Sequence, residues 1–481
     1  MRRGLVLACL MCGCARPPEP SAAQGKQAHV EACHYDVKLT SMTPATLDVK
    51  VHCSGARLTH FRATEPKSVG YISAVRADGH ALRHDGARWV LDGAPSSVEL
   101  RYRVDLDGVA WDVDGFDVAA RYGDSIIAPA STWMLSPEPS GSETRLSLSV
   151  TTPPGQSFAT GLERVGDVYR LRGHELPIAT YALFGKLSSH VERVPGPFAL
   201  AADQQENAPQ AEIDLEFADG DLDTPREVVG AWVHDSVKAV GEFWHGFPVR
   251  RVMISVLPVK DRSGVLFGKV LPESSPGIVI LIGEHTEKKD LYDDWVLVHE
   301  LFHLGVPSFS GEGKWLDEGL ATYYEPLIRA RAGFISERDV WAEFARAMPQ
   351  GLRAVTRLGL EESESYRDIY WGGAIVTLLT DVSVRKDSGG ARGLEDGLRA
   401  VLAAGGNASE VWPLTQVIEV CDRGAQDDAL SKLSLPRMHR GKHVSLPRLW
   451  HDLGVVPVHG GVRLRDDAPL SRTRKAVVFG R

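Results

Sequence analysis

The chain has 481 residues, of which 43% are hydrophobic and 24% are charged, and its formal net charge is −9. This length and composition are typical of a soluble globular protein with about two or three domains and a large apolar core. No cluster of basic residues stands out along the sequence, so nothing in the composition points to a nucleic-acid partner.

Residues 1–13 are typical of a signal peptide for export, because two arginines precede an apolar stretch from Leu5 to Met11. That stretch is too short for a transmembrane helix. Cys14 follows it and opens a linker over 14–29, a pattern typical of a bacterial lipoprotein whose cysteine carries lipid. We therefore expect an exported protein, anchored in a membrane through Cys14 and facing the periplasm or the cell exterior. An ordinary signal peptide or a misplaced start is the alternative.

Residues 30–198 predict a β domain. Apolar and polar residues alternate from Val98 to Leu106, and the same pattern returns from Leu146 to Val150. A period of two residues indicates strands with one buried face. We expect a β-sandwich-like or saddle-like domain that carries no chemistry of its own.

Cysteines in this domain predict a disulfide. Cys33 and Cys53 flank two alternating stretches that could pair as neighbouring strands. An oxidising compartment would allow the two thiols to form a bond. Cys421 is then left as a free thiol, which we expect to be buried.

Residues 199–406 include the sequence HELFH at 299–303, an HExxH motif, and resemble a thermolysin-like catalytic domain. A polar segment comes first, then a helix from Pro225 to Trp244 and strands over Val252–Leu257 and Ile278–Ile282. Strands that precede a helix of the HExxH type are the layout of this domain. Its edge strand could bind a substrate backbone by β-addition.

The central motif is HELFH, residues 299–303. His299 and His303 are four positions apart, so both imidazoles lie on one face of a helix, where they can bind one metal ion with Glu300 beside its open side. A catalytic zinc needs a third protein ligand and a water. Glu318, fourteen residues after His303 in the segment WLDEGLATYYE, is the candidate. We therefore predict one Zn²⁺ ion at this site.

Glu325 lies on nearly the same helix face as Glu318, seven residues later. It is a candidate for orienting a ligand histidine through a hydrogen bond. An ordinary solvated glutamate is the alternative. Pro326 directly after it removes a backbone hydrogen bond and predicts a kink in the helix.

The segments VHELFHL and WLDEGLATYYE together resemble zinc peptidases of the gluzincin type, namely the aminopeptidase N and glycyl aminopeptidase families. The resemblance implies that Glu318 is the third zinc ligand and that Tyr370, which opens the segment YWGGA, steadies the tetrahedral intermediate. Tyr366 competes for that role. The spacing between His303 and Glu318 is shorter than in aminopeptidase N, which favours the glycyl aminopeptidase side or a further relative.

These features predict a zinc-dependent peptidase that hydrolyses peptides or proteins with an activated water. The resemblance favours an aminopeptidase, although the Gly-x-Met-Glu-Asn segment that holds the substrate amino group in aminopeptidase N does not occur here. Endopeptidase action and hydrolysis of a non-peptide bond at the same site stay open. The other alternative is a lipid-anchored, zinc-containing binding protein without turnover.

Residues 407–481 predict a C-terminal helical region with a mixed tail, including a short helix near Pro447. The expected fold class is therefore multidomain α+β. It has an N-terminal β-sandwich-like domain, a thermolysin-like domain and a helical C-terminal region.

Overall fold

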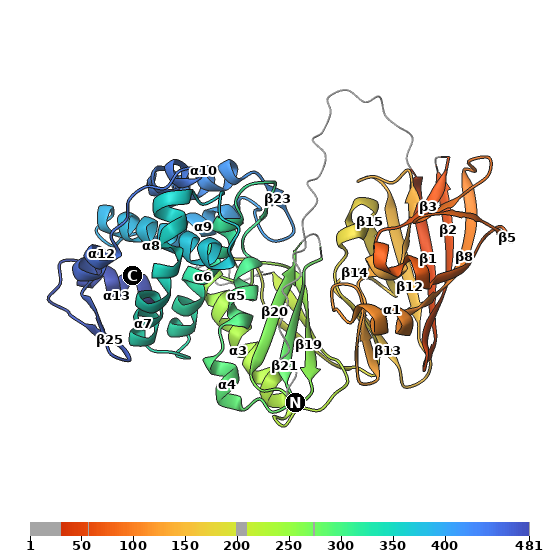
Figure 1. Ribbon diagram of the computed structural model, residues 1–481, viewed down its shortest axis with the longest axis horizontal. Helices are drawn as coiled ribbons and strands as arrows, with labels where there is room; N and C mark the ends of the chain where they lie inside the picture. Colours follow the sequence, from red (N-terminus) through yellow and green to blue (C-terminus); the bar gives the residue numbers. More distant parts are fainter. Residues whose placement is uncertain (1–29, 56, 199–208, 273–274, 481) are drawn as a thin grey trace, which may run out of the picture.

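A computed structural model of the chain describes residues 30–55, 57–198, 209–272 and 275–480. Figure 1 shows three parts side by side along the long axis: a β-rich N-terminal domain, a mixed sheet with helices against it, and a helical C-terminal part. The mixed α+β, multidomain prediction is thus confirmed. The expected signal peptide, Cys14 and the linker 14–29 lie outside the described residues. Within those residues, no helix is long and apolar enough to cross a membrane.

The N-terminal domain is built on one large sheet of order β14-β15-β12-β1-β2-β8-β4-β5. Its strands are β1 (Val30–Met42), β2 (Ala45–Gly55), β4 (Ile72–Ala77), β5 (His80–Ala81), β8 (Ser97–Asp105), β12 (Arg145–Thr151), β14 (Glu163–Val165) and β15 (Val168–Arg172). The alternation predicted for β8 is present, since Val98, Leu100, Tyr102 and Val104 are buried. Leu106 does not continue the strand but begins a helix, because the Asp105 side chain accepts a hydrogen bond from Gly108 N and caps it.

Two four-stranded sheets complete this domain, with the orders β13-β16-β10-β9 and β11-β3-β7-β6. Their strands are β3 (His60–Ala63), β6 (Arg83–Asp85), β7 (Arg88–Val90), β9 (Ala120–Tyr122), β10 (Ser125–Ile127), β11 (Leu135–Glu138), β13 (Ser157–Thr160) and β16 (Ala182–Gly185). Two short helices, α1 (Leu106–Val113) and α2 (Ala130–Trp133), connect strands. Cys33 and Cys53 face each other across β1 and β2 and are joined in a disulfide.

The second part begins earlier than the sequence predicts. β17 (Ser188–Pro195) pairs along its whole length with β18 (Gln210–Phe217), in a five-stranded sheet of order β17-β18-β19-β21-β20. The predicted boundary at 198 is therefore about ten residues too late, because alternation alone does not reveal which sheet a strand joins. The remaining strands are β19 (Arg251–Val259), β20 (Val265–Leu271) and β21 (Gly277–Gly283). β20 is the edge strand and runs antiparallel to β21.

Helices cover this sheet and continue into the C-terminal part. They are α3 (Arg226–Trp244), α4 (Lys288–Asp293), α5 (Val296–His303), α6 (Lys314–Arg331), α7 (Glu337–Ala347), α8 (Tyr366–Asp387), α9 (Leu394–Ala403), α10 (Leu414–Ala425), α11 (Ala429–Ser434), α12 (Leu446–Leu453) and α13 (Ser471–Phe479). Short strand pairs join β22 (Ser308–Phe309) to β23 (Val411–Trp412), and β24 (Val455–Val458) to β25 (Gly461–Leu464). α6 runs through Pro326 as one helix, so the kink predicted there does not break it.

A single apolar core extends from Val194 to Val478. The predicted boundary at 406 therefore does not separate two cores, and the C-terminal helices pack on the same interior as the sheet. Cys421 lies in this core as a buried free thiol. A smaller apolar cluster, with members such as Tyr181 from the N-terminal domain and Met253 from β19, joins the two larger parts.

Candidate active site

Helix α5 carries the HELFH motif. The Asp294 carboxylate accepts a hydrogen bond from Val296 N at 2.7 Å and so satisfies a free backbone donor where the helix begins. Both histidines are buried, with ring centroids 4.9 Å apart on one face of the helix. The four-residue spacing in the sequence thus becomes a pair of adjacent imidazoles.

Helix α6 brings Glu318 to these imidazoles. Glu318 Oε2 lies 3.3 Å from His299 Nε2 and 3.6 Å from His303 Nε2. The possible ligand atoms of the three residues all lie within 4.8 Å of one another. Two imidazole nitrogens and a carboxylate oxygen are a donor set of catalytic zinc sites, which keep one position open. The three side chains therefore fit one zinc ion.

Glycines set the distance between α6 and α8. A Cβ atom at Gly373 would lie 1.9 Å from the backbone oxygen of Trp315, and one at Gly319 would lie 2.4 Å from the backbone of Gly373. The two helices can pack this closely only without these side chains. This packing explains Gly373, the second glycine after Trp371, and the close contact holds Tyr370 beside the histidines.

Glu300 lies between α5 and the edge strand β20. Its Oε2 accepts a hydrogen bond from Val270 N at 2.9 Å. Burial raises the pKa of Glu300, and the neighbouring histidines act in the opposite direction. A Cβ atom at Gly268 would lie 3.0 Å from Glu300 Cγ, so the glycine lets the strand pass over this side chain.

Tyr370 stacks on His299, with ring centroids 5.6 Å apart and an interplanar angle of 4°. Burial and the charges of Glu318 and Glu300 raise the pKa of Tyr370, which keeps its phenol protonated as a hydrogen-bond donor. Its competitor Tyr366 is 58% exposed and lies beneath the Lys314 ammonium. The structure thus brings Tyr370 and not Tyr366 to the candidate metal ligands.

Asp317 is a site residue that the sequence reasoning missed. Its Oδ1 lies 2.8 Å from His303 Nδ1, while the other ring nitrogen of His303 faces Glu318. Burial lowers the pKa of His303, but the two carboxylates outweigh burial and raise it. Its position directly before Glu318 in the sequence was the available signal, although neighbouring residues usually point to different sides of a helix.

Glu325 is buried, with 2% of its surface exposed, so the alternative of a solvated glutamate is wrong. Its carboxylate pairs with Arg329 at 3.4 Å. Among the described residues, no hydrogen bond joins it to His299, whose Nδ1 is buried without a partner. The role of Glu325 in orienting that histidine stays a prediction.

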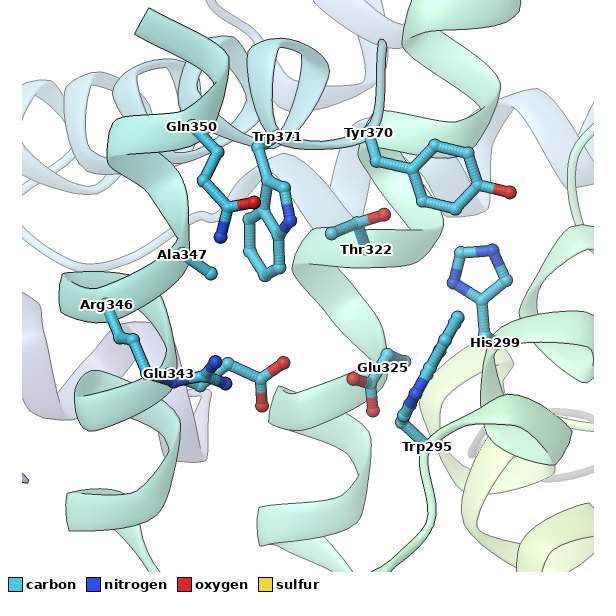
Figure 2. A pocket seen from close by; sticks show the side chains of 10 residues that line it. All are labelled: Trp295, His299, Thr322, Glu325, Glu343, Arg346, Ala347, Gln350, Tyr370 and Trp371. Carbon is cyan, nitrogen blue, oxygen red and sulfur yellow. The ribbon is translucent and has the colours of Figure 1, made fainter. Parts of the chain in front are cut away.

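A cavity of about 280 Å³ opens beside His299. Figure 2 shows how the lining residues lie. Tyr370 and Trp295 lie near the imidazole of His299, and the carboxylates of Glu325 and Glu343 face each other at the bottom of the view, which we call the floor of the cavity. Burial raises the pKa of both carboxyl groups. This cavity has aromatic walls, and its floor next to the candidate metal site carries two carboxyl groups together with the guanidinium group of Arg346.

No protein-family profile matches the sequence, and no curated protein matches it. The fold matches solved structures. An aminopeptidase N family protein from Idiomarina loihiensis superposes with a TM-score of 0.67 at 15% identity, over 88% of this chain and 80% of the other. A native yeast LTA4 hydrolase superposes with a TM-score of 0.50 at 11% identity, over 90% of this chain and 72% of the other.

The chain therefore shares its fold with these two proteins, and the predicted resemblance to the aminopeptidase N family is confirmed at the level of the fold. Whether the chain is nearer to the glycyl aminopeptidases stays a prediction. A match at this identity does not carry over an activity, which has to be argued from the site.

Proposed function

We propose that the protein is a zinc-dependent peptidase with a thermolysin-like catalytic domain. The observation that carries this proposal is the convergence of His299, His303 and Glu318 with Glu300 next to them. A zinc ion held by the first three side chains would polarise the scissile carbonyl and lower the pKa of a water molecule.

The chain's own residues would supply the remaining chemistry. Glu300, held by Val270 N, accepts a proton from the attacking water and returns it to the leaving amine. Tyr370 donates a hydrogen bond to the oxygen on which negative charge develops. Asp317 accepts the hydrogen bond of His303 Nδ1 and so keeps that ring turned with Nε2 toward Glu318.

We infer that the enzyme acts as an aminopeptidase. The carboxyl groups of Glu325 and Glu343 line the floor of the cavity beside His299, where they would accept hydrogen bonds from a substrate ammonium group, and Arg346 lies beside Glu343. A cation that enters the cavity would favour the ionised form of both carboxyl groups. Since this floor lies on α6 and α7, the ammonium would be held without a Gly-x-Met-Glu-Asn segment on the edge strand.

The test is hydrolysis of a peptide panel with free and blocked amino termini, by the chain from Ala15 onward and by its Glu300→Gln variant. We expect cleavage of free peptides only, with a loss of about 10²-fold to 10⁴-fold in the variant, which keeps its zinc. Cleavage of blocked peptides would instead show an endopeptidase. Full activity of the variant would contradict the mechanism, and no cleavage by zinc-loaded protein would favour a binding protein or a non-peptide substrate.

We also propose that the protein is exported and anchored through lipid at Cys14. The disulfide between Cys33 and Cys53 supports an oxidising compartment. The test is fractionation of cells that express the full chain or its Cys14→Ser variant. We expect the full chain in the membrane fraction and the variant in the soluble fraction, and equal distribution would contradict the anchor.

A further inference from the structure

Between the N-terminal domain and the mixed sheet lies a second cavity, of about 920 Å³. Six arginines line it, which we call the arginine cleft: Arg145, Arg164, Arg170, Arg172, Arg250 and Arg251. Three glutamates also line it, so the formal charge of its walls is positive in a chain whose net charge is −9. Figure 1 shows β14 and β15, which contribute part of the wall, on the side of the N-terminal domain that faces the mixed sheet.

The arginines of the N-terminal wall are arranged by strand register. Arg145 on β12 lies directly opposite Arg172 on β15, and Arg170 follows two residues away on the same face. Like charges directly opposite each other destabilise a sheet. Arg145, Arg170 and Arg172 are exposed, and none forms an ion pair with another described residue. Glu163 on β14 lies opposite Arg170 in the strand register, so one carboxylate faces three guanidinium groups and the cluster keeps a formal positive charge.

The opposite wall belongs to the start of β19. Arg250 is exposed and, within the described residues, has no acidic partner either. Arg251 instead pairs with Asp214 and donates hydrogen bonds to the backbone oxygens of Gly161 and Leu162 in the N-terminal domain. These bonds tie the two walls together. The shape of the cleft is therefore fixed by hydrogen bonds between the two domains.

Two short segments of the chain connect the cleft to the candidate active site. Ser275 and Pro276 line it, and Ser275 follows Val270, which holds Glu300, by five residues. At 3.8 Å per residue the chain between them can span at most about 19 Å. On the other edge, the segment that includes Asn407 is fastened to the end of α5, because Ala408 N donates to Leu304 O.

We propose that the arginine cleft binds an acidic segment of a peptide. Arginine pairs with carboxylates through two parallel hydrogen bonds, and four of these arginines are free to do so. The concave shape does not admit a flat lipid surface. Among the residues that the structure describes, the lining contains no aromatic side chain on which nucleobases could stack. An extended peptide of about six residues would cover the maximum span between Val270, beside Glu300, and Ser275 in the cleft.

The proposal that the cleft binds an acidic peptide depends only on the residues of the cleft. The relation of this binding to cleavage rests on the proposed function. The experiment therefore measures binding in the Glu300→Gln protein, by fluorescence anisotropy of a labelled peptide with a run of glutamates, at low salt. We expect binding that weakens as salt is added. Combining Arg145→Ala with Arg172→Ala should weaken it about tenfold or more, because two charge-assisted contacts are lost.

The matched control is Arg83→Ala, an exposed arginine on β6 outside the cleft, which should leave binding unchanged. Equal binding by the double variant and the parent would overturn the proposal, as would an equal loss in the control. Vesicles with anionic lipid or single-stranded DNA that compete through the same two arginines better than the peptide would also overturn it. If the protein cleaves no peptide, but the double variant loses binding and the control does not, the proposed function is wrong and the proposed peptide site in the cleft is supported.

Discussion

Asp317 Oδ1 lies 2.8 Å from His303 Nδ1, and the next residue in the chain, Glu318, faces the other nitrogen of the same ring. One turn of α6 thus supplies both a candidate metal ligand and the acceptor that orients a second candidate ligand. A carboxylate in this position fixes the tautomer of a ligand histidine and strengthens its binding to zinc.

Replacing Asp317 should therefore weaken zinc binding without removing a ligand. We expect Asp317→Asn to lower zinc affinity by about tenfold to a hundredfold. Competition with a chromophoric chelator measures this effect independently of activity. Glu312→Gln is the matched control, because Glu312 is an exposed acid just before α6. Unchanged affinity in Asp317→Asn would show that the hydrogen bond has no role in zinc binding.

Substitutions of the two tyrosines at the start of α8 should have very different effects on kcat. Tyr370 stacks on His299, whereas Tyr366 is 58% exposed. We expect Tyr370→Phe to lower kcat by about a hundredfold, since a hydrogen bond to the developing oxyanion is lost. Tyr366→Phe should have little effect. Steady-state kinetics on one peptide, with circular dichroism to verify folding, measures both, and the reverse order would transfer the role to Tyr366.

The contact between α6 and α8 should not accept a larger residue. Gly373→Ala would place Cβ against the backbone oxygen of Trp315. Overpacking of this kind typically costs about 1–3 kcal/mol. We expect a lower Tm by thermal unfolding, together with weaker zinc binding because α6 carries Glu318. Gly70→Ala is the control, since nothing lies within 4 Å of a Cβ there. Equal Tm values would show that the helices can move apart freely.

Stability should depend on pH through Glu216 in β18. Burial raises its pKa from 4.5 to about 7, while its hydrogen bond with Ser189 lowers it and the nearby Asp214 raises it. Between these two pH values the folded state holds a proton that the unfolded state has lost. The free energy of unfolding therefore falls as pH rises from about 4.5 to 7, by up to about 1.4 kcal/mol per pH unit.

Glu216→Gln removes this titration. Denaturant unfolding at pH 5 and pH 8 should show the variant gaining stability relative to the parent at the higher pH. The pKa of Asp214 is also raised by burial, despite Arg251, so part of the slope stays in the variant. A parent and a variant with identical pH dependence would contradict a buried, protonated Glu216.

Much of the candidate site follows from local sequence. The spacing of His299 and His303 places two imidazoles on one face of any α-helix. Glu318 lies on the next helix, after a short loop. Alternation in β8 is a local property of one strand, and the pairing of Cys33 with Cys53 depends on β1 and β2, which are neighbouring strands with a short connection. Such features are set by the period of helices and strands, so they can be predicted without a tertiary structure.

Other features were decided only by tertiary contacts. β17 has the pattern of the N-terminal strands, yet its hydrogen bonds go to β18. Nothing in the sequence around Glu325 shows that α7 and α8 will bury it. Arg145, Arg172 and Arg250 are far apart in the chain and lie in an acidic protein, so composition suggests no basic site. Strand register and domain contact bring them together, because long-range packing, unlike periodicity, is not encoded in any one stretch.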